Sequence, residues 1–384
     1  GIRKSLNNKL LTPFGFRPVA EIGLGTKVCA VDGTVTEVIG VYPQGVRPIY
    51  RCHFSDGSSV EVDDNHIWQG WRVNQTVKKG SVRTSGANAV RNYTMRELIG
   101  FVGRERTRTA YATNRLAIPV AEPVSYNVSG QLISRGNFVS RAGLHPYVLG
   151  VLLGDGCMTD GKTLTFCSAD DEIPGRVKSL LGEDDAMLGP YSQDRSAKNY
   201  RIKSESALAT LRSLGIMGKY AWEKSIPRIY KMASVVERWE LLRGLMDTDG
   251  WADADGDIYY ASTSKQLADD VREVAMSLGG IVTTREKTPK YTYLGERKEG
   301  RRAYTLRLKF RDNGMAFFLP RKRDIAAAKR SQNFCRYMER IERIEDDESV
   351  CFQVAHPSSL YITNDFIVTH NSDGLLVDFV RHWH

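Results

Sequence analysis

The stretch HPYVLGVLLGDG, residues 145–156, and a later counterpart RWELLRGLMDTDG, residues 238–250, decide the fold of this chain. Each is an apolar run of helical length that has a glycine near its middle and ends in Asp-Gly. Glycine permits close approach of two backbones and also terminates helices. We therefore expect two helices that pack side by side and touch at Gly150 and Gly244.

The elements that follow each helix also recur. An expected strand, a helix and a basic strand come after the first helix, and the same series comes after the second. These segments are KTLTFCSAD (162–170), EIPGRVKSLLG (172–182) and NYRIKS (199–204), then DIYYASTS (257–264), KQLADDVREVAMSLGG (265–280) and YTLRLKF (304–310). Two pseudo-symmetric α/β halves are expected, and they bring Asp155 and Asp249 together.

Two adjacent carboxylates at the end of a helix pair suit a hard divalent cation such as Mg²⁺. Metal ions held between an attacking water and a scissile phosphate are what phosphodiester hydrolysis requires. The alternative is that each Asp-Gly is an ordinary helix exit, since this pair is common in turns. A single copy favours that alternative, whereas two copies in matching contexts favour a metal site at Asp155 and Asp249.

The segments on either side have a different hydrophobic pattern. Residues 10–71 alternate in hydrophobicity between turn signals such as VDGT, YPQG and FSDGSS, which predicts short strands. Residues 72–142 are basic and poorly patterned, apart from a helix expected to begin near Thr94. A helical stretch is expected around 322–341, and strand texture returns at 349–371. The outer β parts are thus expected to flank an inserted α/β domain.

Composition narrows the class of protein. A chain of 384 residues suits two domains. It has no apolar run of the roughly 20 residues that a membrane helix needs and no signal-like start, which favours the cytoplasm over a membrane. The net charge of +9 suggests an anionic partner, with nucleic acid first. The six cysteines lack metal-ligand spacing and predict neither a disulfide framework nor a structural zinc.

The segments 148–156 (VLGVLLGDG) and 242–250 (LRGLMDTDG) resemble the two motifs of the LAGLIDADG homing endonucleases. The resemblance covers about residues 143–330. It implies a single-chain enzyme that cuts double-stranded DNA at a long, asymmetric site, with Mg²⁺ held by Asp155 and Asp249. The sheets of such enzymes lie in the major groove, where side chains read base edges.

Further residues are candidates for this site. By the same resemblance, Gly154 and Thr248, directly before the two acids, are further metal ligands, and Lys224 in EKSIP resembles a family lysine before Ile-Pro. Lys203 and Lys309 stand at equivalent places on the two basic strands, where a cation would stabilise phosphate charge or lower the pKa of the attacking water. The alternative for these two is a solvated face that touches backbone phosphates without specificity.

Residues 369–372, THNS, contain groups for a different reaction. An asparagine side-chain amide can attack its own main-chain carbonyl and break the following peptide bond, and here that residue is Asn371. His370 would donate the proton that the leaving amine needs. Ser372 offers a hydroxyl that accepts an acyl group before the break. On its own the tripeptide is a common surface sequence, so its context decides.

That context resembles the inteins. Residues 359–372 (SLYITNDFIVTHNS) resemble their C-terminal splicing block, and 12–28 with 54–68 resemble their first two blocks. The resemblance implies the Hint fold, a horseshoe-like β architecture, at about residues 5–75 and 345–371. An endonuclease inserted between the two parts is the usual arrangement, so the two resemblances support each other.

The intein resemblance also implies roles. His66 stands where inteins keep a histidine that activates the N-terminal scissile bond, and Asp63 stands where threonine is more common. Trp68, Cys351 and Thr369 match the three positions that define class 3 inteins, in which an internal cysteine attacks the N-terminal junction directly.

The first nucleophile has two candidates. The best boundary in the sequence lies near Lys4-Ser5, and most inteins begin with a nucleophilic residue there. Ser5 would need an activating base, whereas a thiol such as that of Cys351 is already partly ionised at neutral pH. We therefore expect Cys351 to attack first and keep Ser5 as the alternative.

The expected fold is mixed: an all-β Hint domain plus an inserted α/β LAGLIDADG domain with pseudo-twofold αββαββα-type repeats. The expected parts are N-terminal host residues 1–4, the N-terminal Hint part 5–142 with an additional basic region at about 72–142, the endonuclease 143–330, the C-terminal Hint part 331–371 and C-terminal host residues 372–384. The expected function is self-splicing without a cofactor, together with Mg²⁺-dependent double-strand cleavage at the intein-less host site.

The setting expected is a monomer in a prokaryotic or phage-encoded context. Joined to GIRK, the C-terminal segment would give a Lys-Ser pair faintly like the end of a P-loop, which suggests a P-loop ATPase as the host. Two alternative functions remain: a DNA-binding protein with a degenerate, non-cutting endonuclease fold, and a Hint autoprocessing domain that cleaves without ligation.

Overall fold

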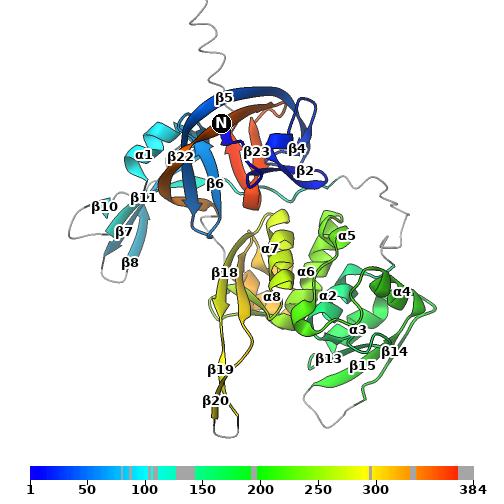
Figure 1. Cartoon of the computed structure of the whole chain (residues 1–384). Coiled ribbons are helices and arrows are strands. Elements are labelled where there is room, and N and C mark those ends of the chain that lie inside the picture. Colours follow the sequence, from blue (N-terminus) through cyan, green and yellow to red (C-terminus); the bar gives the residue numbers. More distant parts are fainter. Residues whose placement is uncertain are drawn as a thin grey trace, which may run out of the picture. The chain divides into compact units, whose positions relative to one another are not determined.

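The chain folds into two compact units, which Figure 1 shows as a computed structural model. Unit 1 combines residues 1–127 with 333–384, and unit 2 is formed by 128–332. The structure describes residues 1–78, 81–85, 89–102, 105–106, 111–126, 143–191, 197–293, 296–328 and 334–370.

Unit 1 is built on antiparallel strands drawn from both of its chain segments. Its strands are β1 Ile2–Arg3, β2 Lys9–Thr12, β3 Gly15–Pro18, β4 Lys27–Cys29, β5 Val35–Phe54, β6 Ser59–Asp63, β7 Ile67–Lys78, β8 Ser81–Ser85, β9 Arg91–Thr94, β10 Glu105–Arg106, β11 Tyr111–Ile118, β22 Arg336–Val354, β23 Leu360–Thr363 and β24 Ile367–His370. The main sheet has the order β4-β5-β6-β1-β22-β11-β7-β8, and a second sheet has the order β24-β23-β2-β3. Both sheets therefore need the C-terminal segment.

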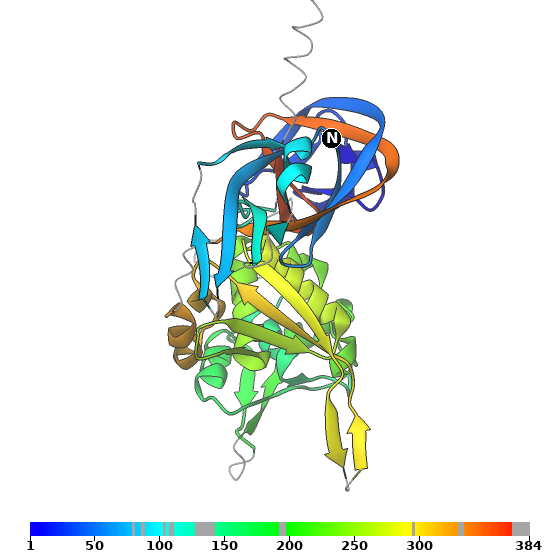
Figure 2. The same cartoon turned by 90° about the vertical axis from the view of Figure 1, so that its left-hand side faces the viewer.

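The long strands β5 and β22 pair along most of their length and form a curved band (Figures 1 and 2). Register shifts interrupt this ladder at several points, and such bulges bend and twist paired strands. The turn predicted at YPQG, residues 42–45, is wrong, because β5 runs through it opposite β22. Only Gly45 in this segment has the positive φ, 68°, that suits a turn glycine.

Helices are few among the described residues of unit 1. α1 Met95–Phe101 begins where the sequence predicted, with Thr94 and Glu97 forming a reciprocal capping box. Short 3₁₀ turns lie at η1 Val19–Glu21 and η4 Asn364–Phe366. A buried core of aliphatic and aromatic side chains that includes Trp68, Tyr93 and Phe352 lies beneath the strands.

Unit 2 has two similar halves around a central helix pair. The first half contains α2 Pro146–Gly154, β12 Gly156–Cys157, β13 Leu164–Ser168, α3 Glu172–Ser179, β14 Ala186–Leu188, β15 Lys198–Lys203 and α4 Glu205–Ser213. The second contains α6 Val235–Asp249, β16 Gly250–Ala252, β17 Ile258–Ser262, α7 Lys265–Ser277, β18 Ile281–Lys287, β19 Lys290–Tyr293, β20 Glu296–Glu299, β21 Ala303–Lys309, η3 Asn313–Ala316 and α8 Pro320–Ala327. The turn η2 Ala221–Glu223 and helix α5 Arg228–Lys231 connect the halves.

The strand order confirms the predicted duplication. One sheet has the order β12-β13-β15-β14 and the other β16-β17-β21-β18, so equivalent strands occupy equivalent places. The β19–β20 hairpin is an addition to the second half (Figure 1). The helix expected at 322–341 is only partly correct, since α8 ends at Ala327 and β22 starts at Arg336.

The mixed architecture predicted from the sequence is therefore present, with a β unit interrupted by an α/β unit. Within the described residues, no helix combines the length and the apolar character that crossing a membrane requires.

Candidate active sites

Helices α2 and α6 touch at the two glycines that the sequence singled out. A Cβ atom added to Gly150 would lie 2.5 Å from the carbonyl oxygen of Leu241, and one added to Gly244 would lie 2.3 Å from that of Tyr147. Both distances are shorter than real Cβ contacts, so glycine is required at both places. This close packing brings the C-terminal ends of the two helices together.

Asp155 caps the end of α2, and Asp249 is the last residue of α6. The Asp249 carboxylate lies beside Gly154, where an added Cβ would be 3.3 Å from its Oδ2 atom. Burial, and then the charge of Asp155, raise the pKa of Asp249 to about 6. Burial also raises the pKa of Asp155. The two carboxyl groups therefore share one region and repel each other when both are ionised.

A buried lysine closes the end of each motif helix. Lys224 Nζ donates to the carbonyl oxygens of Leu152, Leu153, Gly154 and Gly156 at 2.8 to 3.1 Å. Burial lowers the pKa of Lys224, while the charges of Asp249 and Asp155 oppose the shift.

Lys322 does the same at the other helix. Its Nζ donates to the carbonyl oxygens of Met246, Asp247 and Gly250 at 3.1, 2.6 and 2.7 Å. Burial lowers the pKa of Lys322, and the charges of Asp247 and Asp155 act against that shift. Both lysines also oppose the rise in the pKa of Asp249. The sequence reasoning identified Lys224 and missed Lys322.

Lys203 and Lys309 are the last residues of β15 and β21. Lys203 is exposed and Lys309 is half-buried. Neither is among the charges that act on the two carboxyl groups, where Lys224 and Lys322 are. The lysines whose charges act on the two acids are thus Lys224 and Lys322, and a role for Lys203 and Lys309 stays a prediction.

The other two candidate metal ligands have hydrogen-bond partners within the protein. The Gly154 carbonyl accepts from Lys224. The Thr248 hydroxyl donates back to the carbonyls of Gly244 and Leu245 at 3.0 and 2.9 Å, as a mid-helix threonine often does. A pocket of about 240 Å³ opens beside them and is lined by Gly154, Asp249, Ala221, Ser262 and Ala303, among others.

In unit 1, a second cluster surrounds the first residues of the chain. Strand β1 lies between β6 and β22, with Ile2 opposite both Val62 and Val350. The nitrogen of Gly1 lies 2.7 Å from Asp63 Oδ1, and its carbonyl accepts from the Asp63 amide at 3.0 Å. Ser349 Oγ donates to the other oxygen of the Asp63 carboxylate at 2.6 Å.

His66 joins this cluster to the C-terminal strand. Its Nε2 atom lies 2.5 Å from Thr369 Oγ1 on β24, and Trp68 packs edge-on against its ring with centroids 5.0 Å apart. Burial holds the pKa of His66 well below its usual value, and the charges of the Gly1 amino group and His370 act in the same direction. A hydrogen bond with the Gly1 backbone acts in the opposite direction but is outweighed, so His66 is neutral around pH 7.

Cys351 and His370 complete the described part of the cluster. Cys351 is buried on β22 next to Val350, whose carbonyl oxygen would lie 2.8 Å from a Cβ on Gly1. His370 is buried at the end of β24, with its Nε2 3.5 Å from the side-chain nitrogen of Asn92. Asn371 and Ser372 lie outside the described residues, as does the expected host segment 372–384.

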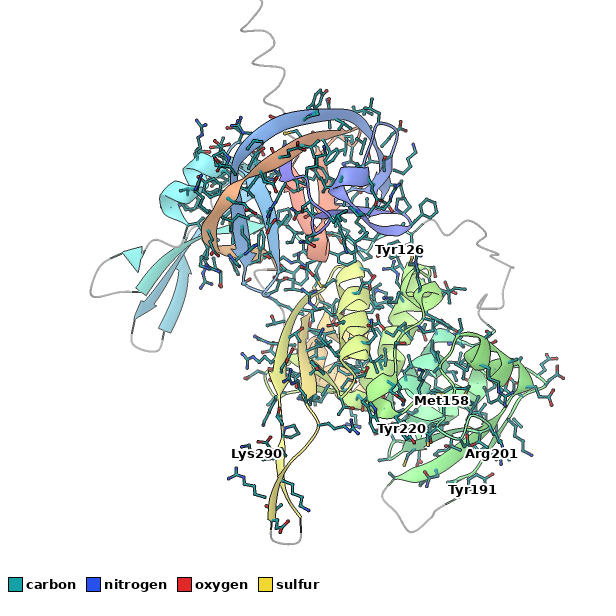
Figure 3. The ribbon with its side chains drawn as sticks, in the orientation of Figure 1. Tyr126, Met158, Tyr191, Arg201, Tyr220 and Lys290 are labelled. Atoms are coloured by element: carbon teal, nitrogen blue, oxygen red, sulfur yellow. The ribbon has the colours of Figure 1, made fainter. Side chains whose placement is uncertain are left out.

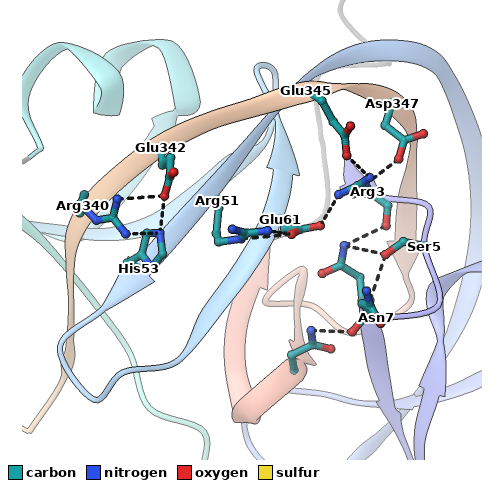
Figure 4. Close-up of polar contacts among 12 residues, drawn as sticks. Arg3, Ser5, Asn7, Arg51, His53, Glu61, Arg340, Glu342, Glu345 and Asp347 are labelled. Atoms are coloured by element: carbon teal, nitrogen blue, oxygen red, sulfur yellow. Dashed lines mark hydrogen bonds and ion pairs between the residues drawn. The ribbon is translucent and has the colours of Figure 1, made fainter.

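Ser5 has different partners, close to Arg3 (Figure 4). Its hydroxyl accepts from the backbone and side-chain nitrogens of Asn8 at 3.2 and 3.3 Å. The intervening Arg3 is fixed by ion pairs with Glu61, Glu345 and Asp347. Gly1, and not Ser5, is the early residue that contacts Asp63.

Sequence comparisons find one matching family model and several relatives. A family model described as a LAGLIDADG-like domain matches residues 237–318. The replicative DNA helicase DnaB of Mycobacterium intracellulare is 28% identical over 98% of this chain and 59% of its own length. The DnaB helicase of Rhodothermus marinus is 26% identical over 71% of this chain and 26% of its own length. The chain thus spans about three fifths of the first of these relatives.

Two solved structures are similar to portions of the chain. A structure of I-DmoI in complex with DNA and Mn covers 44% of this chain and 90% of its own, with 14% identity and a TM-score of 0.29. The Msm DnaB1 intein splicing domain bound with zinc covers 32% of this chain and 90% of its own, with 20% identity and a TM-score of 0.18.

The family match falls inside unit 2, whereas the first helicase relative aligns across both units. The chain therefore contains a LAGLIDADG-like domain at residues 237–318 and, taken as a whole, resembles an intein with an embedded homing endonuclease.

Proposed function

We propose that unit 2 cuts both strands of DNA at the intein-less host site by hydrolysing phosphodiester bonds. The observation that carries this proposal is the convergence of Asp155 and Asp249 at the ends of two helices in glycine contact. Two like charges held together at this energetic cost suggest a cationic ligand, because structural stability alone would favour neutral groups.

The donor atoms fit Mg²⁺. The two carboxylates, with the backbone carbonyls of Gly154 and Thr248 directly before them, form an all-oxygen set of the kind that hard cations prefer. A bound divalent ion would stabilise charge on the scissile phosphate and lower the pKa of an attacking water. Lys224 and Lys322 hold the helix ends in place and keep positive charge beside the acids. Lys203 and Lys309 remain candidates for contacts to phosphate.

DNA is the proposed substrate because basic side chains project from the outer strand faces of both halves. Arg201 on β15 lies at the surface of unit 2 (Figure 3), next to the exposed Lys203. Arg285 and Arg307 are exposed on the paired strands β18 and β21. Such residues neutralise phosphates and approach base edges in the major groove.

A plasmid that carries the uninterrupted host sequence tests this proposal. Asp155→Asn and Asp249→Asn should each abolish cutting while DNA binding persists, because binding comes mainly from the sheets. Asp255→Asn, at an exposed turn of the same unit, serves as the control and should cut normally. Normal cutting by either of the first two variants would refute the assignment, and absence of cutting by the wild type would favour the degenerate DNA-binding alternative.

We further propose that unit 1 splices its flanking host segments, and that the N-terminal scissile bond is the one preceding Gly1. The hydrogen bond from the Asp63 amide to the Gly1 carbonyl supports this choice, as does the position of β1 between β6 and β22 in the main sheet. Residues 1–4, which the sequence suggested as host, therefore belong to the splicing unit in this proposal. Ser5 then lies too far along the chain to act on that bond.

The proposed first step follows class 3 inteins. The thiolate of Cys351 attacks the carbonyl carbon of the residue before Gly1, a thioester forms, and the carbon–nitrogen bond to Gly1 breaks. The neutral His66 takes the proton of the Cys351 thiol and, as the resulting imidazolium, donates it to the Gly1 nitrogen as that nitrogen leaves as an amine. The Asp63 amide holds the Gly1 carbonyl. Trp68 packs against His66, and Thr369 holds the imidazole through its hydroxyl.

The later steps use the C-terminal residues. The acyl group passes from Cys351 to the hydroxyl of Ser372. Asn371 then closes a succinimide and breaks its bond to Ser372, with His370 donating a proton to the leaving amine. The freed amino group of Ser372 finally takes the acyl group from its own oxygen, so that a peptide bond joins the host segments.

A reporter protein fused before Gly1 tests the order of attack. A thiol reagent should release the reporter from the wild type and from Ser5→Ala, and Cys351→Ala should abolish this release. Asn371→Ala should block only the C-terminal break, and it identifies the residue at that junction. Mass spectrometry of each product locates the cut bond and separates ligation from cleavage alone. Reporter release from Cys351→Ala would exclude the internal thiol as nucleophile, and a cut before Ser5 would restore the other boundary.

The host is proposed to be a protein of the DnaB helicase kind, since the chain aligns within such relatives. The P-loop expectation depended on joining Lys4 to Ser372. A junction before Gly1 removes that pairing.

A further inference from the structure

Two exposed aromatic rings stack beside the pocket of unit 2. The rings of Tyr220 and Trp222 lie 4.7 Å apart between centroids and only 2° from parallel. Tyr220 is 51% exposed and Trp222 39% exposed. The guanidinium of Arg301 lies over Trp222, 3.6 Å from the ring centroid. We call Tyr220, Trp222 and Arg301 the aromatic platform.

The platform is fixed to the candidate nuclease site. Its rings flank Ala221, which lines the same pocket as Asp249. The carboxylate of Glu223 accepts from the Tyr220 amide at 2.9 Å, which closes the turn. Lys224 follows directly, and its side chain is anchored to the end of α2. The position of the rings is therefore set by the same residue that caps a motif helix.

Large aromatic side chains in this setting have a specific use. Every nucleobase has a π face, and stacking on an aromatic side chain contributes about 1–3 kcal/mol per base. Arg301 adds a cation that stacks on the ring and still carries donors for a phosphate oxygen. The platform thus combines a stacking surface for a base with a cation for a phosphate, the two contacts that recognise an unstacked nucleotide. It lies next to the pocket that Asp249 lines.

We propose that the aromatic platform receives an unpaired nucleobase of the DNA next to the cutting site, and so stabilises a locally opened duplex. The proposal rests on the nuclease function proposed above and adds a contact that recognises DNA distortion instead of base sequence. Tyr220 and Trp222 are binding residues in this scheme, and Arg301 positions the Trp222 ring.

Fluorescence anisotropy with Ca²⁺ in place of Mg²⁺ tests the platform under conditions chosen to prevent cutting. The probes are two fluorescein-labelled duplexes of the same random sequence, one fully paired and one with three central bases unpaired. The wild type should bind the second more tightly by about 5- to 100-fold, which corresponds to the stacking contribution. Trp222→Ala and Tyr220→Ala should lose most of this preference and bind the paired duplex as before.

Two controls sharpen the result. Trp222→Phe keeps a stacking ring and should retain the preference. Tyr191→Ala removes another exposed tyrosine of the same unit and should change nothing. Equal binding of both duplexes by the wild type, or a preference that survives Trp222→Ala, would overturn the platform while leaving the nuclease proposal intact. Failure to bind either duplex would also overturn the platform, whereas the nuclease proposal is tested separately by the host-sequence plasmid.

Discussion

At the scale of single residues, unit 2 contains two buried lysines whose ammonium groups are bonded by the protein in place of water. Lys224 and Lys322 each use their ammonium group to bond several carbonyl oxygens at a helix end. Such groups complement the negative end of a helix dipole. Removing either lysine would leave buried acceptors without their donor, at a cost of about 1–3 kcal/mol.

Ionisation of the Asp249 carboxyl group lowers the folding stability in a pH-dependent way. Its pKa of about 6 in the folded chain exceeds the ordinary 3.8, so the folded state binds the proton more tightly than the unfolded state. Folding stability without metal should therefore fall as the pH rises from about 4 to about 6, and this loss persists at higher pH. A shift of about two pKa units corresponds to roughly 1–3 kcal/mol once coupling to Asp155 is considered.

Asp249→Asn should thus raise the free energy of unfolding at pH 8 in EDTA, and the gain should fade below pH about 4. Calorimetry of the whole chain across this range measures the effect. Added Mg²⁺ should stabilise the wild type and leave the variant nearly unchanged, because only the wild type has both carboxylates. The exposed Asp255→Asn should show neither effect. Identical pH profiles for the wild type and Asp249→Asn would contradict the buried carboxyl pair.

At the scale of elements, the close contact of α2 with α6 depends on the absence of a Cβ atom at Gly150 and Gly244. Gly150→Ala and Gly244→Ala should each destabilise unit 2 by about 1–3 kcal/mol, because a methyl group would press on the opposite backbone. The melting temperature should drop by several degrees, and DNA cutting should weaken as the two carboxylates separate.

Gly175→Ala provides the matched control. This glycine lies within α3, and an added Cβ would meet nothing within 4 Å. Replacing glycine by alanine at such a helical position should stabilise by up to about 1 kcal/mol. The tight-packing argument fails if all three variants shift the melting temperature in the same direction.

The elements also reveal what the sequence could predict. The duplicated helices and their strands were recognisable because hydrophobic periodicity and Asp-Gly endings are local signals. The role of Lys322 was not recognisable, since this residue reaches the end of α6 only after α8 folds back. Its sequence context also differs, because Lys322 follows Pro320 whereas Lys224 precedes Pro227. The turn expected in β5 is wrong because pairing with β22, more than 300 residues away, overrides local turn chemistry.

The place of Gly1 depended on long-range pairing in the same way. Ser5 attracted attention as the nearest hydroxyl, but strand β1 is defined only by its partners β6 and β22. The cluster of His66, Trp68 and Thr369 was accessible because a family resemblance supplied the tertiary information that one sequence lacks.

At the scale of the whole molecule, the two proposed activities use different units. Asp249→Asn should leave the yield of spliced product unchanged, and Cys351→Ala should leave plasmid cutting unchanged, because neither residue contributes to the other unit. Both assays can be run on one preparation of each variant. A change in splicing caused by Asp249→Asn would reveal a dependence between the units.

Because unit 2 interrupts the sheet of unit 1 in the sequence, the strands of this sheet are synthesised at two different times. Strands β22, β23 and β24, which carry Cys351 and Thr369, leave the ribosome only after all of unit 2. At about 5–20 residues per second, those inserted residues delay the last strands by roughly 10–40 s. Unit 2 has time to fold first, while β1 and β5 have β6 beside them but still lack β22. The insertion therefore delays the synthesis of Cys351 and Thr369. Neither splice junction can be attacked until translation has passed the nuclease domain.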